Sequence, residues 1–270
     1  MALFAAVQSI LAASDPRAKL AAVHALHTAW RASTVTLDRD EPIDLLDQPA
    51  RPDLPRLIPP QQVPKRGMGT PEGRAALLHA LAHIEFNAIH LALDACVRFR
   101  AMPIDYYADW LGVAAEEAKH FGLLADSLER RGFHYGSFDA HNGLWEMAAR
   151  TAGDSLARMA LVPRIFEARG LDVTPGIIKR FTAIGDRDAV AILEIILADE
   201  IGHVAIGNRW YHWLCTVRGV DPDTTFAALA RLHRAPRPHR PMNRPARLAG
   251  GFTAAELDQL DQLDQLDATP

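Results

Sequence analysis

Apolar residues recur every three or four positions along most of the chain, which is the spacing of one face of an α-helix. The pattern predicts four long helices, each bounded by a capping residue, a proline or a glycine. They cover about residues 70–100, 104–130, 141–169 and 186–218. The first two are joined by a short connection, so we expect them to pack as antiparallel neighbours.

Shorter elements flank these four helices. Two short helices are expected at the start of the chain, the second with Asp15 as its cap and Pro16 in its first turn. Residues 38–69 are too rich in proline for a regular helix and should form a connector. Further short helices are expected at about 175–184, 224–233 and 253–266. Within the third long helix, Pro163 should cause a kink.

The resulting prediction is an all-α protein built as a single domain over residues 1–270. Residues 1–69 would supply the N-terminal helices and the Pro-rich connector. Residues 70–219 would form a four-helix bundle, and residues 220–270 would form a C-terminal extension.

Composition and charge narrow the class of protein. Hydrophobic residues make up 49% of the chain, enough for a sizeable core. Charged residues interrupt every apolar helix before the ~18 to 20 apolar residues of a membrane span, so we expect no membrane association. The N-terminus lacks the basic start of a secretory signal, which favours a cytoplasmic protein. Cys96 and Cys215 are far apart on predicted helices and are expected to be buried thiols.

One segment departs from the net charge of −4. Its arginines, interleaved with prolines, could bind phosphate or an acidic partner, because guanidinium groups bind oxyanions through paired hydrogen bonds. The alternative is an extended strap on the acidic surface of the protein itself or of a second subunit. We favour the strap, since the whole chain is acidic, and nucleic acid is the disfavoured partner. The arginines are Arg231, Arg234, Arg237, Arg240, Arg244 and Arg247.

A repeated spacing of glutamate and histidine indicates a metal site. Glu117 and His120 form one Glu-x-x-His pair, and Glu200 and His203 form a second. Residues three apart share a helix face, so each pair points at one spot. A lone glutamate precedes each pair by nearly the same interval, 32 residues for Glu85 (117 − 85) and 33 for Glu167 (200 − 167). One pair could arise by chance. Two pairs with matched lone glutamates favour a metal site over a core of polar side chains that are hydrogen-bonded to one another.

Bundles that bind two iron or manganese ions use this set, one Glu from each of two helices and a Glu-x-x-His from each of the others. The predicted ligands are Glu85, Glu117, His120, Glu167, Glu200 and His203. Carboxylate with imidazole suits Fe and Mn. Metal-bound histidines donate their other N–H to a carboxylate. Asp199 is the expected carboxylate for His120 and Glu116 for His203, although Glu116 is better explained as a solvated acid. Arg158 and Arg164 flank Glu167 and could neutralise carboxylates or meet an anionic substrate.

Three segments carry a resemblance to a known family. They are residues 116–121 (EEAKHF), 167–175 (EARGLDVTP) and 199–204 (DEIGHV). These resemble the domain of unknown function 455 family, and the similarity extends over most of the chain. The resemblance implies a ferritin-like diiron bundle without an established substrate. Through the ligand pattern alone, the chain is more distantly similar to diiron hydroxylases that modify tRNA.

Three functions are compatible with these observations. The first is a diiron oxidoreductase, an oxidase or hydroxylase that uses O₂ and a small-molecule substrate. Roughly 70 residues before the bundle and 50 after it favour this function, since such additions shape a pocket or an interface. The second is a ferroxidase or iron-handling protein. The third is a non-catalytic interaction bundle that the metal only stabilises. Two Fe ions, or Mn in their place, are the expected cofactors. No catalytic residue besides the ligands is indicated, and a homodimer is compatible with the sequence.

Overall fold

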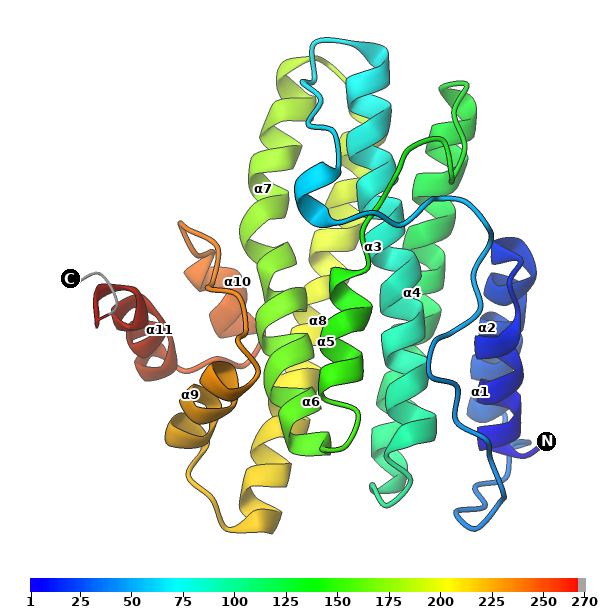
Figure 1. Cartoon of the computed structure of the whole chain (residues 1–270), viewed down its shortest axis with the longest axis vertical. Helices are drawn as coiled ribbons and strands as arrows, with labels where there is room; N and C mark the ends of the chain where they lie inside the picture. Colours follow the sequence, from blue (N-terminus) through cyan, green and yellow to red (C-terminus); the bar gives the residue numbers. More distant parts are fainter. Residues whose placement is uncertain (267–270) are drawn as a thin grey trace. The chain divides into compact units, whose positions relative to one another are not determined.

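The computed structural model describes residues 1–266, and over these it is all-helical, as the sequence predicted (Figure 1). No strand forms in the described residues, where only two isolated bridges occur. The chain divides into two compact units, Met1–Ala149 and Arg150–Pro270. The interpretation of the chain as one domain stays a prediction.

The first unit is built around one helical hairpin. Its two long helices, α3 and α4, pack against each other, while α1 packs on α3 and α2 on α4. The helices that begin this unit start where the sequence predicted, since Asp15 and Thr70 accept hydrogen bonds from the backbone of the first turns of α2 and α3. The elements are α1 (Leu3–Ala12), α2 (Pro16–Arg31), η1 (Pro60–Gln62), α3 (Pro71–Arg98) and α4 (Ile104–Arg130). The chain then enters α5 (Gly143–Arg150).

The Pro-rich connector between α2 and α3 is irregular apart from the single turn η1, as predicted. It is nevertheless tied to the hairpin. Arg39 donates hydrogen bonds to the carbonyl oxygens of Arg100 and Met102, which follow α3. Arg56 forms two hydrogen bonds with the carboxylate of Asp139 beyond α4.

Helix α3 is long and apolar enough to cross a membrane, and it alone passes this test among the described residues. Most of its apolar window, 72%, is buried inside the protein. A core helix of a soluble protein passes the same test, so this helix is weak evidence for a span. The sequence predicted no such helix, because polar side chains interrupt its run of apolar residues.

A lysine is buried where α2 meets α3. Lys19 is fully buried, its Nζ donates to the carbonyl oxygen of Ala50 at 2.8 Å, and it lies 2.6 Å from Nε2 of His90. Its ammonium group also lies over the ring of Phe86. Burial lowers the pKa of Lys19 to about 7. Burial also holds the pKa of His90 well below its usual value, so the imidazole is neutral and its Nε2 can accept a hydrogen bond from Lys19.

We expect the stability of the protein to depend on the charge of Lys19. The unfolded chain, with a lysine pKa of about 10.4, binds this proton between pH 7 and pH 10, whereas the folded protein releases it. Stability should therefore rise with pH across this window, by at most ~1.4 kcal/mol per pH unit from this group. Urea unfolding of the Lys19→Met variant should show this part of the rise removed. Parallel pH profiles of the two proteins would contradict the assignment.

The second unit contains a second hairpin, formed by α7 and α8, with shorter helices packed on it. Helix α8 begins and ends as predicted, because Asp186 caps its first turn and Gly219 leaves it with a φ of 64°. The elements are α6 (Ser155–Leu161), η2 (Val162–Glu167), α7 (Ala168–Ala183), α8 (Arg187–Arg218), α9 (Pro222–Leu232), α10 (Arg244–Ala249) and α11 (Ala254–Leu266). Cys96 and Cys215, one in each unit, are buried free thiols as predicted.

The third long helix was predicted wrongly. Instead of one helix over 141–169, the structure has α5, a break at 151–154, α6, and the turn η2, which is wound as a π-helix. Pro163 lies in η2 and lacks the N–H that an α-helical bond would use, so the chain widens there, as the expected kink implied. Gly170 does not end the helix, and the separate helix expected from about residue 175 is the second half of α7.

The continuity of α7 through Pro175 has a specific cause. A proline inside a helix leaves the carbonyl four residues earlier without a backbone donor, here that of Leu171. The side-chain amide of Asn243 donates to this carbonyl at 3.1 Å. The oxygen of the same amide caps α10 by accepting from Ala246 N. One side chain from the C-terminal segment therefore completes α7 and begins α10.

The second half of the Arg-rich segment is a strap within its own unit, as we favoured from the sequence. Arg247 is buried and forms two hydrogen bonds with the buried carboxylate of Asp172, with Nε at 3.0 Å and Nη2 at 2.7 Å from its oxygens. Arg244 and Arg240 form ion pairs with carboxylates of α11. These contacts fix the segment and α10, which the sequence interpretation missed, on α7 and α11.

Candidate metal site

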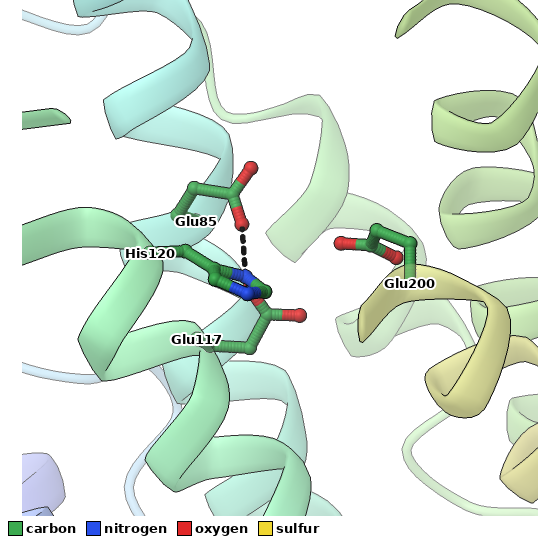
Figure 2. A group of neighbouring side chains, drawn as sticks. All are labelled: Glu85, Glu117, His120 and Glu200. Atoms are coloured by element: carbon green, nitrogen blue, oxygen red, sulfur yellow. Dashed lines mark ion pairs between the residues drawn. The ribbon is translucent and has the colours of Figure 1, made fainter. Parts of the chain in front are cut away.

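The first unit brings three predicted ligands together in its core. Glu85 of α3 and Glu117 and His120 of α4 are 4%, 0% and 0% exposed. Each offers one ligand atom, and these atoms lie within 4.8 Å of one another. Nδ1 of His120 lies 3.3 Å from Oε2 of Glu85 and 3.4 Å from Oε2 of Glu117. Figure 2 shows these side chains converging, and it also draws Glu200 of α8.

The electrostatics of this group explain why it can exist in a core. Burial disfavours the charged imidazole, but the close carboxylates of Glu117 and Glu85, with their negative charges, outweigh it and raise the pKa of His120 to about 11. The imidazolium is thus the positive partner of two buried carboxylates. A metal ion would take its place, because a metal-binding histidine must be neutral. A buried set of two carboxylates and one imidazole could hold such an ion.

The second unit presents the same pair of ligand types in the same way. Glu200 and His203 of α8 are both buried, and Nδ1 of His203 lies 3.7 Å from Oε2 of Glu200. The atoms are those that approach each other in the pair of Glu117 and His120. Each Glu-x-x-His therefore lies on the second helix of its hairpin with the imidazole Nδ1 turned toward the carboxylate.

The fourth predicted glutamate lies just before α7, the first helix of the second hairpin, whereas Glu85 lies within α3. Glu167 is half-buried and is the last residue of the π-helical turn η2. A π-helical turn inserts extra backbone into a helix, which changes the direction of the side chains that follow, and such turns are frequent at functional sites. The irregular turn at Pro163, where we expected a kink, therefore leads directly to the candidate ligand Glu167.

A close contact sets the register of the two ligand-bearing helices in the second unit. A Cβ atom at Gly207 of α8 would lie 2.1 Å from Cβ of Pro163, so the helices can approach this closely only at a glycine. Gly207 is four residues after His203, and Pro163 is four residues before Glu167, so each lies one turn from a ligand on a shared face. The sequence interpretation did not identify Gly207. A glycine in the middle of a long apolar helix was the available signal.

We expect Gly207→Ala to destabilise the protein by about 1–3 kcal/mol, because the added methyl group overpacks the contact with Pro163. Gly202→Ala is the matched control, since Gly202 lies on the same helix with nothing within 4 Å of the added Cβ. There the higher helix propensity of alanine should stabilise by up to ~1 kcal/mol. Urea unfolding measures both values. Equal effects at the two positions would show that the close approach does not hold the helices.

The remaining predicted residues have different environments. Asp199 is half-buried on α8, whereas Glu116 is exposed on α4, as a solvated acid would be. Their assignment as partners of the ligand histidines stays a prediction. Arg158 is buried and donates to the hydroxyl of Thr151 at 2.9 Å. Arg164 pairs with Glu256 of α11, so it neutralises a carboxylate that the sequence interpretation had not considered.

The other histidines of α3 have structural partners in the first unit. His79 accepts a hydrogen bond from Gly136 N at 2.9 Å, and His83 lies 2.8 Å from the hydroxyl of Tyr135. Burial lowers the pKa of both histidines to about 4. His90 is the partner of Lys19 described above. These rings are neutral structural elements.

The sequence matches one family model and one curated protein. Residues 12–258 match the model described as "Protein of unknown function (DUF455)". A protein of Haemophilus influenzae described as "Uncharacterized protein" is 50% identical over 216 residues, which cover 77% of this chain and 75% of the relative. No solved structure matches the chain.

Proposed function

The chain belongs to the family of proteins of unknown function DUF455, and we propose that it is a ferritin-like dinuclear iron protein that uses O₂ to oxidise or hydroxylate a substrate. The observation that carries the proposal is the internal repeat of the ligand pattern. Each hairpin carries a Glu-x-x-His on its second helix, and in both pairs the same atoms face each other. A lone glutamate lies within the first helix of the first hairpin and immediately before the first helix of the second. This is the ligand set of diiron and dimanganese carboxylate bundles.

In the proposed arrangement the two hairpins together form a four-helix bundle. The ligands are Glu85, Glu117 and His120 from the first hairpin and Glu167, Glu200 and His203 from the second. The two histidines and the four carboxylates would together hold the ions. Carboxylates and imidazoles favour iron, and manganese fits the same donors. All of these ligands except Glu167 are buried, which supports a site that excludes bulk water.

The residues of this chain would do three things in such a site. The carboxylates neutralise the charge of the ions, and the buried helices hold the ligands in place before a metal arrives. Asp199 would hydrogen-bond to the second ring nitrogen of His120 and fix its orientation. The chemistry that a reduced iron pair supplies when bound is the reduction of O₂.

The test is anaerobic loading with Fe(II), removal of unbound metal, and exposure to O₂ while absorbance and oxygen consumption are recorded. We expect two ions per chain, consumption of O₂ and a change in absorbance that depends on the bound iron. Continued oxidation of excess Fe(II) would instead identify a ferroxidase. Binding of metal with no oxygen consumption, but with a higher melting temperature, would identify a bundle that metal only stabilises. Failure to bind any metal would refute the proposal.

A further inference from the structure

A second candidate site lies in the second unit, in a pocket lined by α9, the segment that follows it and η2. The pocket has a volume of about 310 Å³. This is at the lower end of the ~300–1,000 Å³ range of small-molecule sites. It is about twice the ~150 Å³ cavity that holds one benzene ring, which suits a ligand of about a dozen non-hydrogen atoms. None of the proposed metal ligands lines it.

Five arginines line this pocket, and their charges are not all neutralised. They are Arg164, Arg231, Arg234, Arg237 and Arg247. Glu256 pairs with Arg164, and Asp172 pairs with Arg247. Among the side chains of residues 1–261, Arg231 and Arg234 have no hydrogen-bond or ion-pair partner. None of the described residues that line the pocket is a carboxylate, so its lining has an excess of positive charge.

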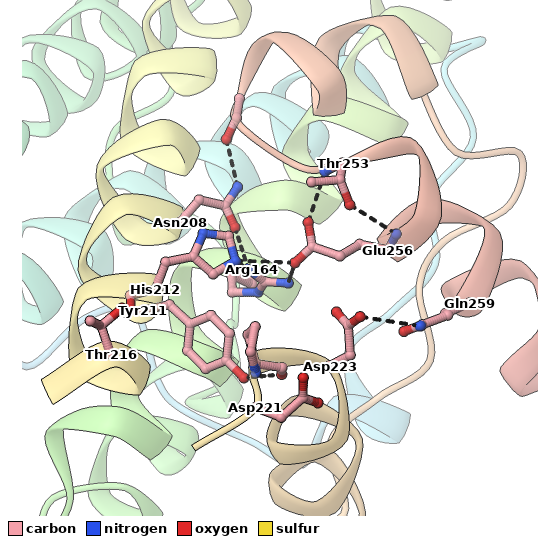
Figure 3. Close-up of polar contacts among 12 residues, drawn as sticks. Arg164, Asn208, Tyr211, His212, Thr216, Asp221, Asp223, Thr253, Glu256 and Gln259 are labelled. Carbon is pink, nitrogen blue, oxygen red and sulfur yellow. Dashed lines mark hydrogen bonds and ion pairs between the residues drawn. The ribbon is translucent and has the colours of Figure 1, made fainter. Parts of the chain in front are cut away.

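One of these arginines is held rigidly in the interior. Arg164 is 2% exposed, and its two terminal nitrogens donate to Asn208 at 2.7 Å and to Glu256 at 2.6 Å, as Figure 3 shows. Its guanidinium also lies 4.4 Å from the ring centre of Tyr211 and 4.9 Å from that of Phe226. Its buried Nε–H has no hydrogen-bond acceptor in the described part of the chain. A buried donor in this state costs free energy, which an anionic ligand could recover.

The rest of the lining is apolar. Ile165, Phe226 and Leu260 contribute the larger side chains, and alanines of α9 and prolines of the following segment fill the spaces between the arginines. A purely inorganic anion would leave this surface unused. A ligand with both an acidic head and a hydrocarbon part would match both kinds of lining.

We infer that this pocket binds a small amphipathic anion, a phosphate or carboxylate attached to an alkyl or aryl group. Arg231 and Arg234 would bind the oxyanion through charge-assisted hydrogen bonds. Ile165, Phe226 and Leu260 would contact the hydrocarbon. The first half of the Arg-rich segment is then a ligand site, while its second half is the strap. This inference does not depend on metal binding, and it assigns a role to arginines for which the sequence left an anion and a strap as alternatives.

Hexyl phosphate and heptanoate, titrated by isothermal calorimetry, are the probes for the two possible head groups, with hexan-1-ol as the neutral analogue and inorganic phosphate as the bare anion. We expect at least one amphipathic anion to bind more tightly than both the alcohol and inorganic phosphate. The tighter of the two identifies the head group. If the alcohol bound as tightly as the amphipathic anions, the charge would contribute nothing to binding. If inorganic phosphate bound as tightly, the apolar lining would contribute nothing.

Two variants place the binding in this pocket. Arg231→Gln with Arg234→Gln should weaken it at least tenfold, whereas Lys179→Gln with Arg187→Gln, which removes the same charge from exposed positions of the same unit, should not. Ala230→Phe fills the pocket without changing its charge and should also abolish binding. Unchanged affinity in both pocket variants, or no binding of either anion, overturns the inference. So does salt-sensitive binding of an oligonucleotide that the small anions fail to displace.

Discussion

Glu117→Ala and Glu200→Ala are each expected to remove at least one of the two proposed metal ions from the protein. Both side chains are buried beside a histidine of the same helix, so each substitution removes a ligand atom from the interior. The measurement is metal content per chain after anaerobic loading with Fe(II), read by mass spectrometry. Addition of metal should also raise the melting temperature of the wild-type protein more than that of either variant.

The matched control for these variants is Glu194→Ala, which removes an exposed carboxylate from α8. It should bind as many ions per chain as the wild type. Glu117→Gln and Glu200→Gln keep the volume of the side chain, so they separate the loss of a ligand from the loss of packing. Full occupancy in the Glu200→Ala protein would refute the assignment of α8 to the site.

Arg247→Ala is expected to destabilise the protein by about 3–5 kcal/mol, because it leaves the carboxylate of Asp172 buried without its counter-ion. Arg218→Ala breaks an ion pair of the same length between half-exposed groups, and it should cost less than ~1 kcal/mol. Urea unfolding followed by circular dichroism measures both changes.

A double variant, Asp172→Leu with Arg247→Met, tests the same ion pair even if the Arg247→Ala protein does not fold. Replacing both partners of a buried ion pair by apolar residues is often neutral or stabilising. The double variant should therefore be more stable than Arg247→Ala alone. If Arg247→Ala and Arg218→Ala had equal effects, the buried pair would have no special role.

The helices with strong local signals were predictable from the sequence. Asp15, Thr70 and Asp186 are followed by apolar periodicity, and each caps a helix in the structure. The pairing of Glu117 with His120 was equally readable, since a spacing of three residues on a helix fixes a common face.

The errors occurred where contacts distant in sequence overrule a local signal. Glycine commonly ends a helix, yet α7 continues through Gly170 because the apolar face of α7 packs on α8. Pro175 is tolerated inside α7 because Asn243, 68 residues later (243 − 175), supplies the missing donor. Nothing in the sequence around Pro175 could indicate this partner.

Helix α10 had a signal that we overlooked. Asn243 followed by Arg244 and Pro245 is a capping residue with a proline in the first turn, which is the pattern that predicted α2 and α3. The density of prolines and arginines in the segment suggested an extended chain instead. The buried position of Arg247 could not be predicted, because a lone arginine in a charged segment is normally solvated.

The amide of Asn243 makes the order of synthesis relevant to the second unit. A ribosome produces α7 well before residue 243, so for that interval the carbonyl of Leu171 must bond to water and the carboxylate of Asp172 has no guanidinium beside it. The nascent α7 would therefore remain open to solvent along this edge until the last part of the chain leaves the exit tunnel. A chain truncated before this segment would leave the carbonyl of Leu171 and the carboxylate of Asp172 permanently without their partners. Cellular proteases degrade proteins with defects of this kind.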